Sequence, residues 1–313
     1  LHGHYQALCH HRDTAMSDDN YASAVLLLPM NGANDGTVFT DYSPTRKVAS
    51  RYGDLKTVTA QYKYYGSSCY FDGSGDYLKY DYHSSMEFGT GPFTIGCWFR
   101  PSDPSVTRRI YGRSSSTNYI TRESALYFSS ATQIAFYYGI RGTNQTTRTF
   151  TVPSISADNW HYLEFCRDDG GVMRASVDGV FSANTYTDTT NLNGGGVLPL
   201  YIGTMHDLAN YYSGYMQDFF MYKGVALHTS DFTPPGKMLY SLSGTVTDTA
   251  GNPAARTIVG IPRIYPEVVP WTTISDAGDG SYSLYVPDLE ISRLVLADET
   301  SLYNDIVDRV LPG

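Results

Sequence analysis

Short runs of alternating apolar and polar residues recur along most of the chain. In FTIGCWFR, the apolar residues Phe93, Ile95, Cys97 and Phe99 fall on one face of an extended strand. This alternation predicts a half-buried strand with one face in the core of an antiparallel sheet. The same kind of pattern predicts a strand over 93–101 and further strands at 22–30, 67–73, 125–130, 133–140, 147–153, 160–167, 173–179, 198–203 and 214–222.

Turn residues separate these runs. The clearest turn signals are DGSGD (72–76), DDGG (168–171), VDGV (177–180) and NGGG (193–196). Many short strands at this spacing, joined by turns, are typical of an antiparallel β-sandwich. We therefore expect an all-β domain over residues 21–236.

The last strand of this domain has irregular spacing. Met216, Phe219 and Met221 look inward-facing, but the alternation slips between the first and the second of them. Such a slip predicts a β-bulge, and bulges re-aim side chains at the rims of sheets. Asp218 is then expected to point along the sheet edge.

The segment KGVALHTSDFTPP (223–235) follows that strand. We expect the chain to turn at Lys223-Gly224 and then to cross the edge of the sandwich, with Phe232 plugging the core. The two prolines, Pro234 and Pro235, would end strand pairing, because proline lacks the backbone donor of a sheet.

The pattern changes after the two prolines. Residues 242–266 and 272–288 each contain strand, turn and strand, which predicts a second, small β-domain over 237–313. Near the end, roughly helical spacing of apolar residues predicts one helical turn within 301–313. Residues 1–20 lack alternation, so we interpret them as an N-terminal extension, with Met16 as a candidate native start.

Composition agrees with a β-rich fold and excludes some functions. The chain has 28 Tyr, 29 Gly and only 17% charged residues, which favours strands and turns over helices. Its net charge of −9 and the lack of a basic run argue against nucleic-acid binding, and Arg108-Arg109 is interpreted as solvated loop charge. No apolar stretch is long enough for a membrane span.

The four cysteines form no C-x-x-C pair. Cys69, Cys97 and Cys166 lie in strand-like runs and are expected to be buried free thiols, although a single disulfide stays open as an alternative.

Five motifs in this order resemble one family. They are YFDGSGDYLKY (70–80), FGTGPFTIGCWFRP (88–101), NWHYLEFCRDDGGVMRASVDG (159–179), LPLYIG (198–203) and YSGYMQDFFMYKGVALHTSDFTPP (212–235). Together they resemble the laminin-G-like, concanavalin A-like jelly-roll family, and more narrowly its version in bacteriophage structural proteins. This resemblance implies an antiparallel jelly-roll β-sandwich.

The second domain carries its own resemblance. SGTVTDTAGNPAARTIVG (243–260) and TTISDAGDGSYSLYVP (272–287) resemble the small carboxypeptidase-regulatory-like or immunoglobulin-like module often attached to such phage proteins. This implies a small C-terminal β-sandwich.

The family resemblance also implies a calcium ion at a rim of the sandwich, held by aspartates and carbonyl oxygens. The positions that match are Asp41 and Asp218, and Gln217 stands where the family usually has a second acidic residue. The alternative is that these aspartates only cap turns.

Catalytic signatures are missing. Glycosidases need two carboxylates across the scissile bond, and the Glu-x-Asp-x-x-Glu pattern of jelly-roll glucanases does not occur. No G-x-S-x-G is present, and His161, in the family's Trp-His motif, is interpreted as structural. We expect no enzyme activity.

Tyrosine-rich segments are the candidate binding surfaces. A tyrosine ring stacks on sugar faces while its hydroxyl forms hydrogen bonds, and it serves protein interfaces equally well. The loops 102–109 and 204–212 are candidate positions for a grafted site. The candidate contacts for a glycan or a partner are Tyr137, Tyr138, His206, Tyr211 and Tyr212. The alternative is that the tyrosines only cover outer sheet faces.

These observations predict a non-enzymatic adhesion protein of a bacteriophage virion, of the tail-fibre or spike type, made in the host cytoplasm. Its jelly roll would bind a surface or host glycan, with other virion proteins and copies of itself as partners. One alternative is a decoration protein of a capsid or tube that contacts mainly proteins. Another is a carbohydrate-active enzyme.

Overall fold

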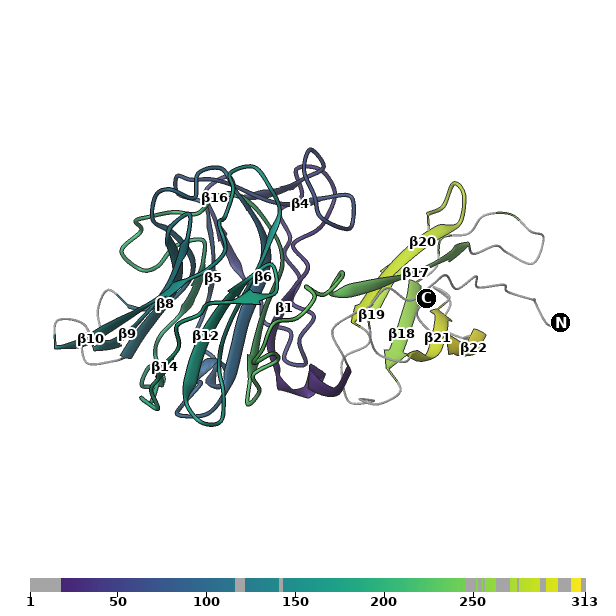
Figure 1. Ribbon diagram of the computed structural model, residues 1–313. Helices are drawn as coiled ribbons and strands as arrows, with labels where there is room; N and C mark the ends of the chain where they lie inside the picture. The colour runs from purple at the N-terminus through teal and green to yellow at the C-terminus, as the bar shows by residue number, and fades with distance from the viewer. Residues whose placement is uncertain are drawn as a thin grey trace. The chain divides into compact units, whose positions relative to one another are not determined.

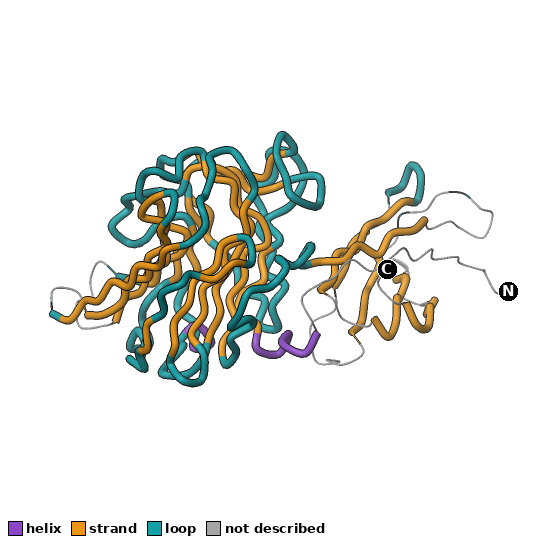
Figure 2. The backbone as a smooth tube through the Cα atoms, viewed as in Figure 1, coloured by secondary structure: helices purple, strands orange, loops and turns teal. Residues whose placement is uncertain are grey.

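The computed structural model describes residues 18–115, 122–140, 143–245, 252, 255, 257–262, 271–274, 276–287, 291–297 and 305–310. Within these ranges the chain forms two compact units that divide between Pro234 and Pro235. Strands are the main regular secondary structure of both units (Figure 2). Each unit is described by itself.

One sheet of the larger unit has nine strands within the described residues. Its main path is β13 (Val180–Phe181), β12 (Val172–Val177), β11 (His161–Arg167), β6 (Phe93–Pro101), β16 (Ser213–Lys223), β4 (Ser68–Asp72) and β3 (Lys56–Val58). β1 (Ala24–Leu28) pairs with β16, and β14 (Tyr186–Thr187) pairs with β12.

The opposite sheet has seven strands in the described part of the chain. Their order is β10 (Asn144–Thr151), β9 (Gln133–Ile140), β8 (Arg122–Ser130), β7 (Arg108–Arg113), β15 (Leu200–Ile202), β5 (Tyr77–Tyr80) and β2 (Ser50–Tyr52). Pairing is antiparallel throughout, and the two sheets stack as a jelly-roll sandwich (Figure 1). The expected fold class is confirmed.

Only short 3-10 helices, η1 (Asp18–Ser23) and η2 (Ser84–Met86), occur among the described residues. None of the helices in this part of the chain has the length and apolar character needed to cross a membrane.

The core lies between the two sheets and follows the predicted alternation. Phe93, Ile95, Cys97 and Phe99 of β6 are fully buried there. The Phe99 ring packs on Phe128 of the opposite sheet, with ring centroids 6.1 Å apart. The inward face of β6 was therefore correctly predicted from its period of two.

The outward face of β6 is also buried, which differs from the expected half-buried strand. Residues 223–235, which we call the strap, cross over this face. The Thr94 hydroxyl donates to the Val225 carbonyl and accepts from the Leu227 amide, both at 3.0 Å. The Cys166 thiol of β11 donates to the His228 carbonyl at 3.2 Å. The strap thus covers the outer side of the sheet and then reaches its edge, as predicted, because the Phe181 amide of the edge strand β13 donates to the Asp231 carboxylate at 2.9 Å.

The prediction that Phe232 plugs the core is wrong. Its ring is half-buried on the outer side of the sheet, 5.9 Å from the Tyr162 ring and stacked on His228 at 3.7 Å. Because the inter-sheet core is already filled from both sheets, the strap has only the outer face available. The turn that starts the strap does lie at Gly224, whose φ is 88°.

The predicted bulge in β16 is present. The register between β16 and β6 shifts between Gln217 and Phe220, and Asp218 has a φ of 50°. Met216, Phe219 and Met221 all lie in the core, as their spacing predicted. The extra residue keeps both halves of the strand facing inward.

The smaller unit is β-rich as well. β17 (Leu239–Thr245) pairs with β20 (Ser281–Pro287), and a second sheet has the order β19 (Trp271–Ile274), β18 (Thr257–Pro262), β21 (Ile291–Ala297) and β22 (Asp305–Val310). The predicted helical turn near the end is wrong, because residues 305–310 pair with β21 as a strand. Branched apolar residues such as Ile306 and Val307 suit a strand better than a helix.

Cys69, Cys97 and Cys166 are buried free thiols, as expected. Cys9 and the proposed start at Met16 lie outside the described residues.

Candidate functional site

The seven-stranded sheet has an outer face that stays partly open. Along β8, Leu126 and Phe128 point into the core, whereas the alternate residues Tyr127 and Ser129 are half-buried on the other side. On β9, Tyr137 is half-buried on this outer side and lies opposite Ala125. Tyr127, Ser129 and Tyr137 therefore share this outer side of the sheet, where all three residues are half-buried.

A pocket of about 570 Å³ lies on this outer face. Strand residues form part of its lining, and the loops 102–109 and 204–212 supply the rest. Its lining residues are Thr107, Arg109, Glu123, Ala125, Tyr127, Ser129, Tyr137, Gln145, Met205, His206, Asp207 and Asn210. The structure thus brings together the two loops that the sequence singled out.

Arg109 ties the two loops together. Its backbone amide donates to the Asn210 carbonyl at 3.0 Å, and its guanidinium donates to the Ala209 carbonyl at 3.0 Å and to the Asp207 carboxylate. The interpretation of Arg109 as a solvated loop charge is therefore wrong: it lies on β7 and is ion-paired.

Gly112 of β7 allows the second loop to lie close to the sheet. A Cβ atom at this position would come within 2.6 Å of the Met205 Cβ. The loop is also held by the His206 amide, which donates to the Ser114 hydroxyl at 3.0 Å. These contacts hold the 204–212 loop against β7 and so fix the position of one wall of the pocket.

The pocket offers charged and neutral hydrogen-bonding groups around its tyrosines. Glu123 is only 2% exposed, and its Oε1 lies 3.9 Å from His206 Nδ1. The Gln145 amide donates to the Tyr137 hydroxyl. The Ser129 hydroxyl is buried with no hydrogen-bond partner among the described residues. A ligand with several hydroxyl groups could satisfy such a mixture of donors and acceptors.

The five predicted contact residues fall into different places. Tyr137 and His206 line the pocket. Tyr211 is half-buried outside the lining, with its ring 6.4 Å from that of Tyr77. For these three residues, contact with a glycan or partner stays a prediction.

The prediction that Tyr138 and Tyr212 contact a glycan or a partner is wrong, because both rings are buried in the core. Neighbouring residues on a strand face opposite sides, so Tyr138 cannot share the open face with Tyr137. Burial raises the pKa of Tyr138 to about 12, and its hydroxyl donates to Asp188. The Tyr212 hydroxyl donates to the Tyr215 carbonyl at 2.9 Å.

Asp41 is buried and fully hydrogen-bonded. Its Oδ1 accepts from the amides of Leu27 and Ser43, at 3.0 and 2.9 Å. Its Oδ2 accepts from the Ser43 hydroxyl at 2.8 Å and from the Lys47 amide at 2.7 Å. These contacts are those of a carboxylate that orders a loop.

Asp218 is buried at the bulge, where its Oδ1 accepts from the Tyr65 hydroxyl at 3.0 Å. Asp218 and Asp41 bond to different parts of the chain: Asp218 accepts from Tyr65, whereas Asp41 accepts from Leu27. Calcium at these two residues stays a prediction.

His161 has the geometry of a structural residue. Its Nδ1 lies 2.7 Å from the Asp178 carboxylate, and its Nε2 accepts from the Ser156 amide at 3.0 Å. Both ring nitrogens thus hold the loops that flank β11, as its interpretation as structural requires.

Several pocket residues could not be found from the sequence. Glu123 and Gln145 come from separate strands that contain no motif, and only the fold brings them to the predicted loop that carries Asp207. The available signal was the polar alternation of β8, which marks an outward face but gives no position for a pocket.

Comparisons with known proteins agree with this fold. A family model described as the concanavalin A-like lectin/glucanases superfamily matches residues 72–230. No curated protein sequence matches the chain.

Among solved structures, the receptor binding domain of botulinum neurotoxin C/D mosaic serotype superposes with a TM-score of 0.52 at 12% identity, covering 91% of this chain and 73% of that one. The botulinum neurotoxin serotype G binding domain gives 0.49 at 10% identity, covering 92% and 70%. The IT-sialidase CBM40 of Ruminococcus gnavus, bound to α2,3-sialyllactose, gives 0.39 at 15% identity, covering 47% and 86%.

At 12% identity, the superposition on the C/D mosaic serotype domain shows a shared fold alone. The family model matches more than half of the chain, and its matched region lies within the larger, jelly-roll unit. The chain therefore belongs to the concanavalin A-like lectin/glucanases superfamily.

Proposed function

We propose that the jelly-roll unit is a carbohydrate-binding module whose ligand lies in the pocket on β7, β8 and β9. The observation that carries this proposal is the half-open sheet face on which Tyr127 and Tyr137 are surrounded by hydrogen-bonding groups. The apolar C–H face of a sugar packs on such rings, and its hydroxyls exchange hydrogen bonds with amide, carboxylate and hydroxyl groups.

The size of the pocket agrees with this proposal. Small-molecule sites usually measure about 300–1,000 Å³, and the volume of about 570 Å³ lies within that range. The pocket therefore suits a short sugar segment.

We propose binding without hydrolysis. A glycosidase needs one free carboxylic acid and a second carboxylate across the bond. The two acidic residues of the pocket already have partners, since Asp207 pairs with Arg109 and Glu123 lies beside His206. A purified protein that releases sugars from a bound polysaccharide would contradict this part of the proposal.

A finer proposal concerns the biological setting. The five motifs of the larger unit resemble phage structural proteins, which supports an adhesin on a virion that binds a host surface glycan. The protein would be made in the host cytoplasm, join other virion proteins and assemble with copies of itself. The 237–313 region would be a spacer or attachment module of the carboxypeptidase-regulatory-like or immunoglobulin-like type. Labelled antibodies should locate the chain on tail fibres or spikes of intact particles, whereas labelling over the capsid or tube would favour decoration.

A glycan array tests the binding proposal. We expect a defined set of glycans to bind the full chain, and Tyr137→Ala to weaken the affinity at least about tenfold, or about 1.4 kcal/mol. The matched control is Tyr62→Ala, which removes a tyrosine that is 50% exposed and outside the pocket lining. Equal loss in both variants, or no glycan bound by the unchanged protein, would refute the proposal.

A further inference from the structure

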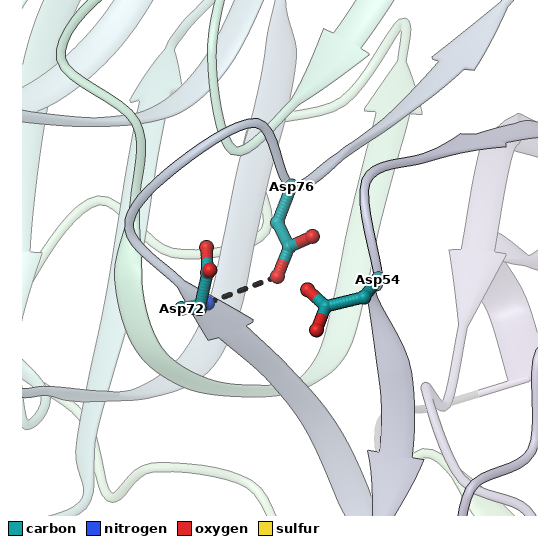
Figure 3. A group of neighbouring side chains, drawn as sticks. All are labelled: Asp54, Asp72 and Asp76. Carbon is teal, nitrogen blue, oxygen red and sulfur yellow. Dashed lines mark hydrogen bonds between the residues drawn. The ribbon is translucent and has the colours of Figure 1, made fainter.

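Three aspartates of the larger unit, none of which lines the pocket, converge on one another. Asp54 lies in the turn between β2 and β3, Asp72 ends β4, and Asp76 immediately precedes β5. One carboxylate oxygen from each lies within 4.8 Å of the other two. Figure 3 shows the carboxylates of Asp54 and Asp76 turned toward each other.

The local chain explains how the carboxylates come so close. The Asp72 amide donates to Asp76 Oδ2 at 3.0 Å, which closes the DGSGD loop. Gly53, with a φ of 70°, lies against the same side chain, because a Cβ there would be 2.2 Å from Asp76 Oδ1. The backbone therefore leaves just enough room for the Asp76 carboxylate.

Asp76 gives the evidence that this cluster binds a ligand. It is 1% exposed, and its Oδ1 is buried without a hydrogen-bond partner among the described residues. An unsatisfied buried oxygen costs about 1–3 kcal/mol, and more when it is charged. Burial raises the pKa of Asp76 to about 6, since the charges of Asp72 and Asp54 add to its effect and the hydrogen bond from the Asp72 amide only partly offsets it.

Nearby basic side chains are directed elsewhere. The Arg51 guanidinium donates to the carbonyls of Gly53 and Leu55, at 3.1 and 3.0 Å. Lys56 forms its ion pair with Asp35, at 2.7 Å. Among the ion pairs of the described residues, none neutralises the three carboxylates.

We propose that Asp54, Asp72 and Asp76 bind one calcium ion. Ca²⁺ takes six to eight oxygen ligands, including carboxylates, carbonyls and water. Asp76, whose Oδ1 is buried without a hydrogen-bond partner among the described residues, would supply a preformed carboxylate ligand, and the exposed Asp54 and Asp72 leave room for water. These residues are distinct from Asp41 and Asp218, and the proposal does not depend on the glycan pocket.

Thermal unfolding of the full chain with CaCl2 or with EDTA tests this site. Calcium at 100 times its Kd should raise Tm by about 5–10 °C. Asp76→Asn should abolish the increase. Asp54→Asn, at an exposed position that does not disturb the core, should weaken calcium affinity at least about tenfold. The matched control Asp81→Asn changes a side chain that is 97% exposed and should leave the increase intact.

Terbium luminescence gives a second readout that does not depend on stability. The rings of Tyr52 and Tyr77 stack at 4.4 Å and belong to residues that flank Gly53-Asp54 and Asp76 in the chain. Tb³⁺ bound at the site should therefore emit on tyrosine excitation, and excess Ca²⁺ should quench the emission. Equal Tm in calcium and EDTA with no terbium emission would overturn the proposal, as would calcium binding that survives Asp76→Asn, or tighter binding of Mg²⁺ than of Ca²⁺.

Discussion

The outer faces of the two sheets in the larger unit differ in how they meet solvent. On the nine-stranded sheet, β6 and β11 are buried on both sides. The strap contacts Thr94, Glu164 and Cys166 on the outward side, and Lys63 and Tyr64 lie over Trp98. On the seven-stranded sheet, the outward residues of β8 and β9 include the half-buried Tyr127 and Tyr137 and line a pocket.

Polar groups on the covered face are tied to the strap. Glu164 of β11 is 0% exposed, and its Oε2 lies 2.9 Å from His228 Nδ1 of the strap. The Tyr162 hydroxyl also donates to this oxygen, at 3.3 Å. A buried carboxylate needs such partners, so the strap is part of the stable fold.

The difference shows which surface is available for a ligand. At β6 and β11 the outer face of the nine-stranded sheet is buried, partly under the strap, and its polar groups are used in contacts that stabilise the fold. The outer face of the seven-stranded sheet keeps hydrogen-bonding groups near solvent. Changes on the covered face should therefore alter folding, and changes on the open face should alter binding.

The largest effect is expected for His228→Ala. The change leaves the buried carboxylate of Glu164 without its partner from the strap, which should lower the free energy of unfolding by about 3 kcal/mol. Urea denaturation followed by fluorescence measures this loss. Thr229→Ala, at an exposed position of the same strap, is the control and should stay within about 0.5 kcal/mol. Similar stability of the two variants would mean that the contact between His228 and Glu164 does not hold the strap on the sheet.

A smaller effect on the free energy of unfolding is expected from the ionisation of Asp188, which lies next to the buried Tyr138. Burial raises the pKa of Asp188, but hydrogen bonds from Thr190 and Tyr138 outweigh it and lower the pKa from 3.8 to about 2. A folded-state pKa below the ordinary value stabilises the fold above pH about 4, and this stabilisation is lost as the pH falls toward 2. Since the carboxylate is partly exposed, we expect roughly 1 kcal/mol.

Urea unfolding of the unchanged protein and of Asp188→Asn between pH 5 and pH 2.5 checks this sign. The stability difference should be largest near pH 5 and should shrink as the pH falls, because the variant has no proton to bind at this position. A difference that is constant with pH would show that Asp188 titrates at its ordinary pKa in the folded state.

The smallest effect on stability is expected for Tyr137→Ala on the open face. Its ring is only half-buried, so the free energy of unfolding should change by about 0.5 kcal/mol. The same urea titration measures it. A loss as large as that of His228→Ala would show that the open face is structural too, and would remove the contrast between the two faces.

The periodicity of the sequence predicted many of the strands, although β2, β3, β5 and β7 are missing from the expected strands. The expected strands at 93–101 and 133–140 have the bounds of β6 and β9, and the slip after Met216 predicted the bulge in β16. These predictions succeeded because alternation and its interruption are local properties of the chain.

The candidate site was predicted only in part. Tyr137 and His206 do line the pocket, but Tyr138 and Tyr212 are buried. The residue types were the same in both cases, and composition cannot tell which of two adjacent tyrosines faces outward until the register of the strand is known.

The amino-acid sequence by itself determined that the chain forms antiparallel β-sheets, that β6 directs alternate residues into a core, and that a bulge interrupts β16, since each depends on neighbours along the chain. Only the tertiary structure decided that the strap lies over the outer face of one sheet, and that Asp54, Asp72 and Asp76 meet. These contacts join residues from separate segments, so they exist only once the strands have paired and the sheets have stacked.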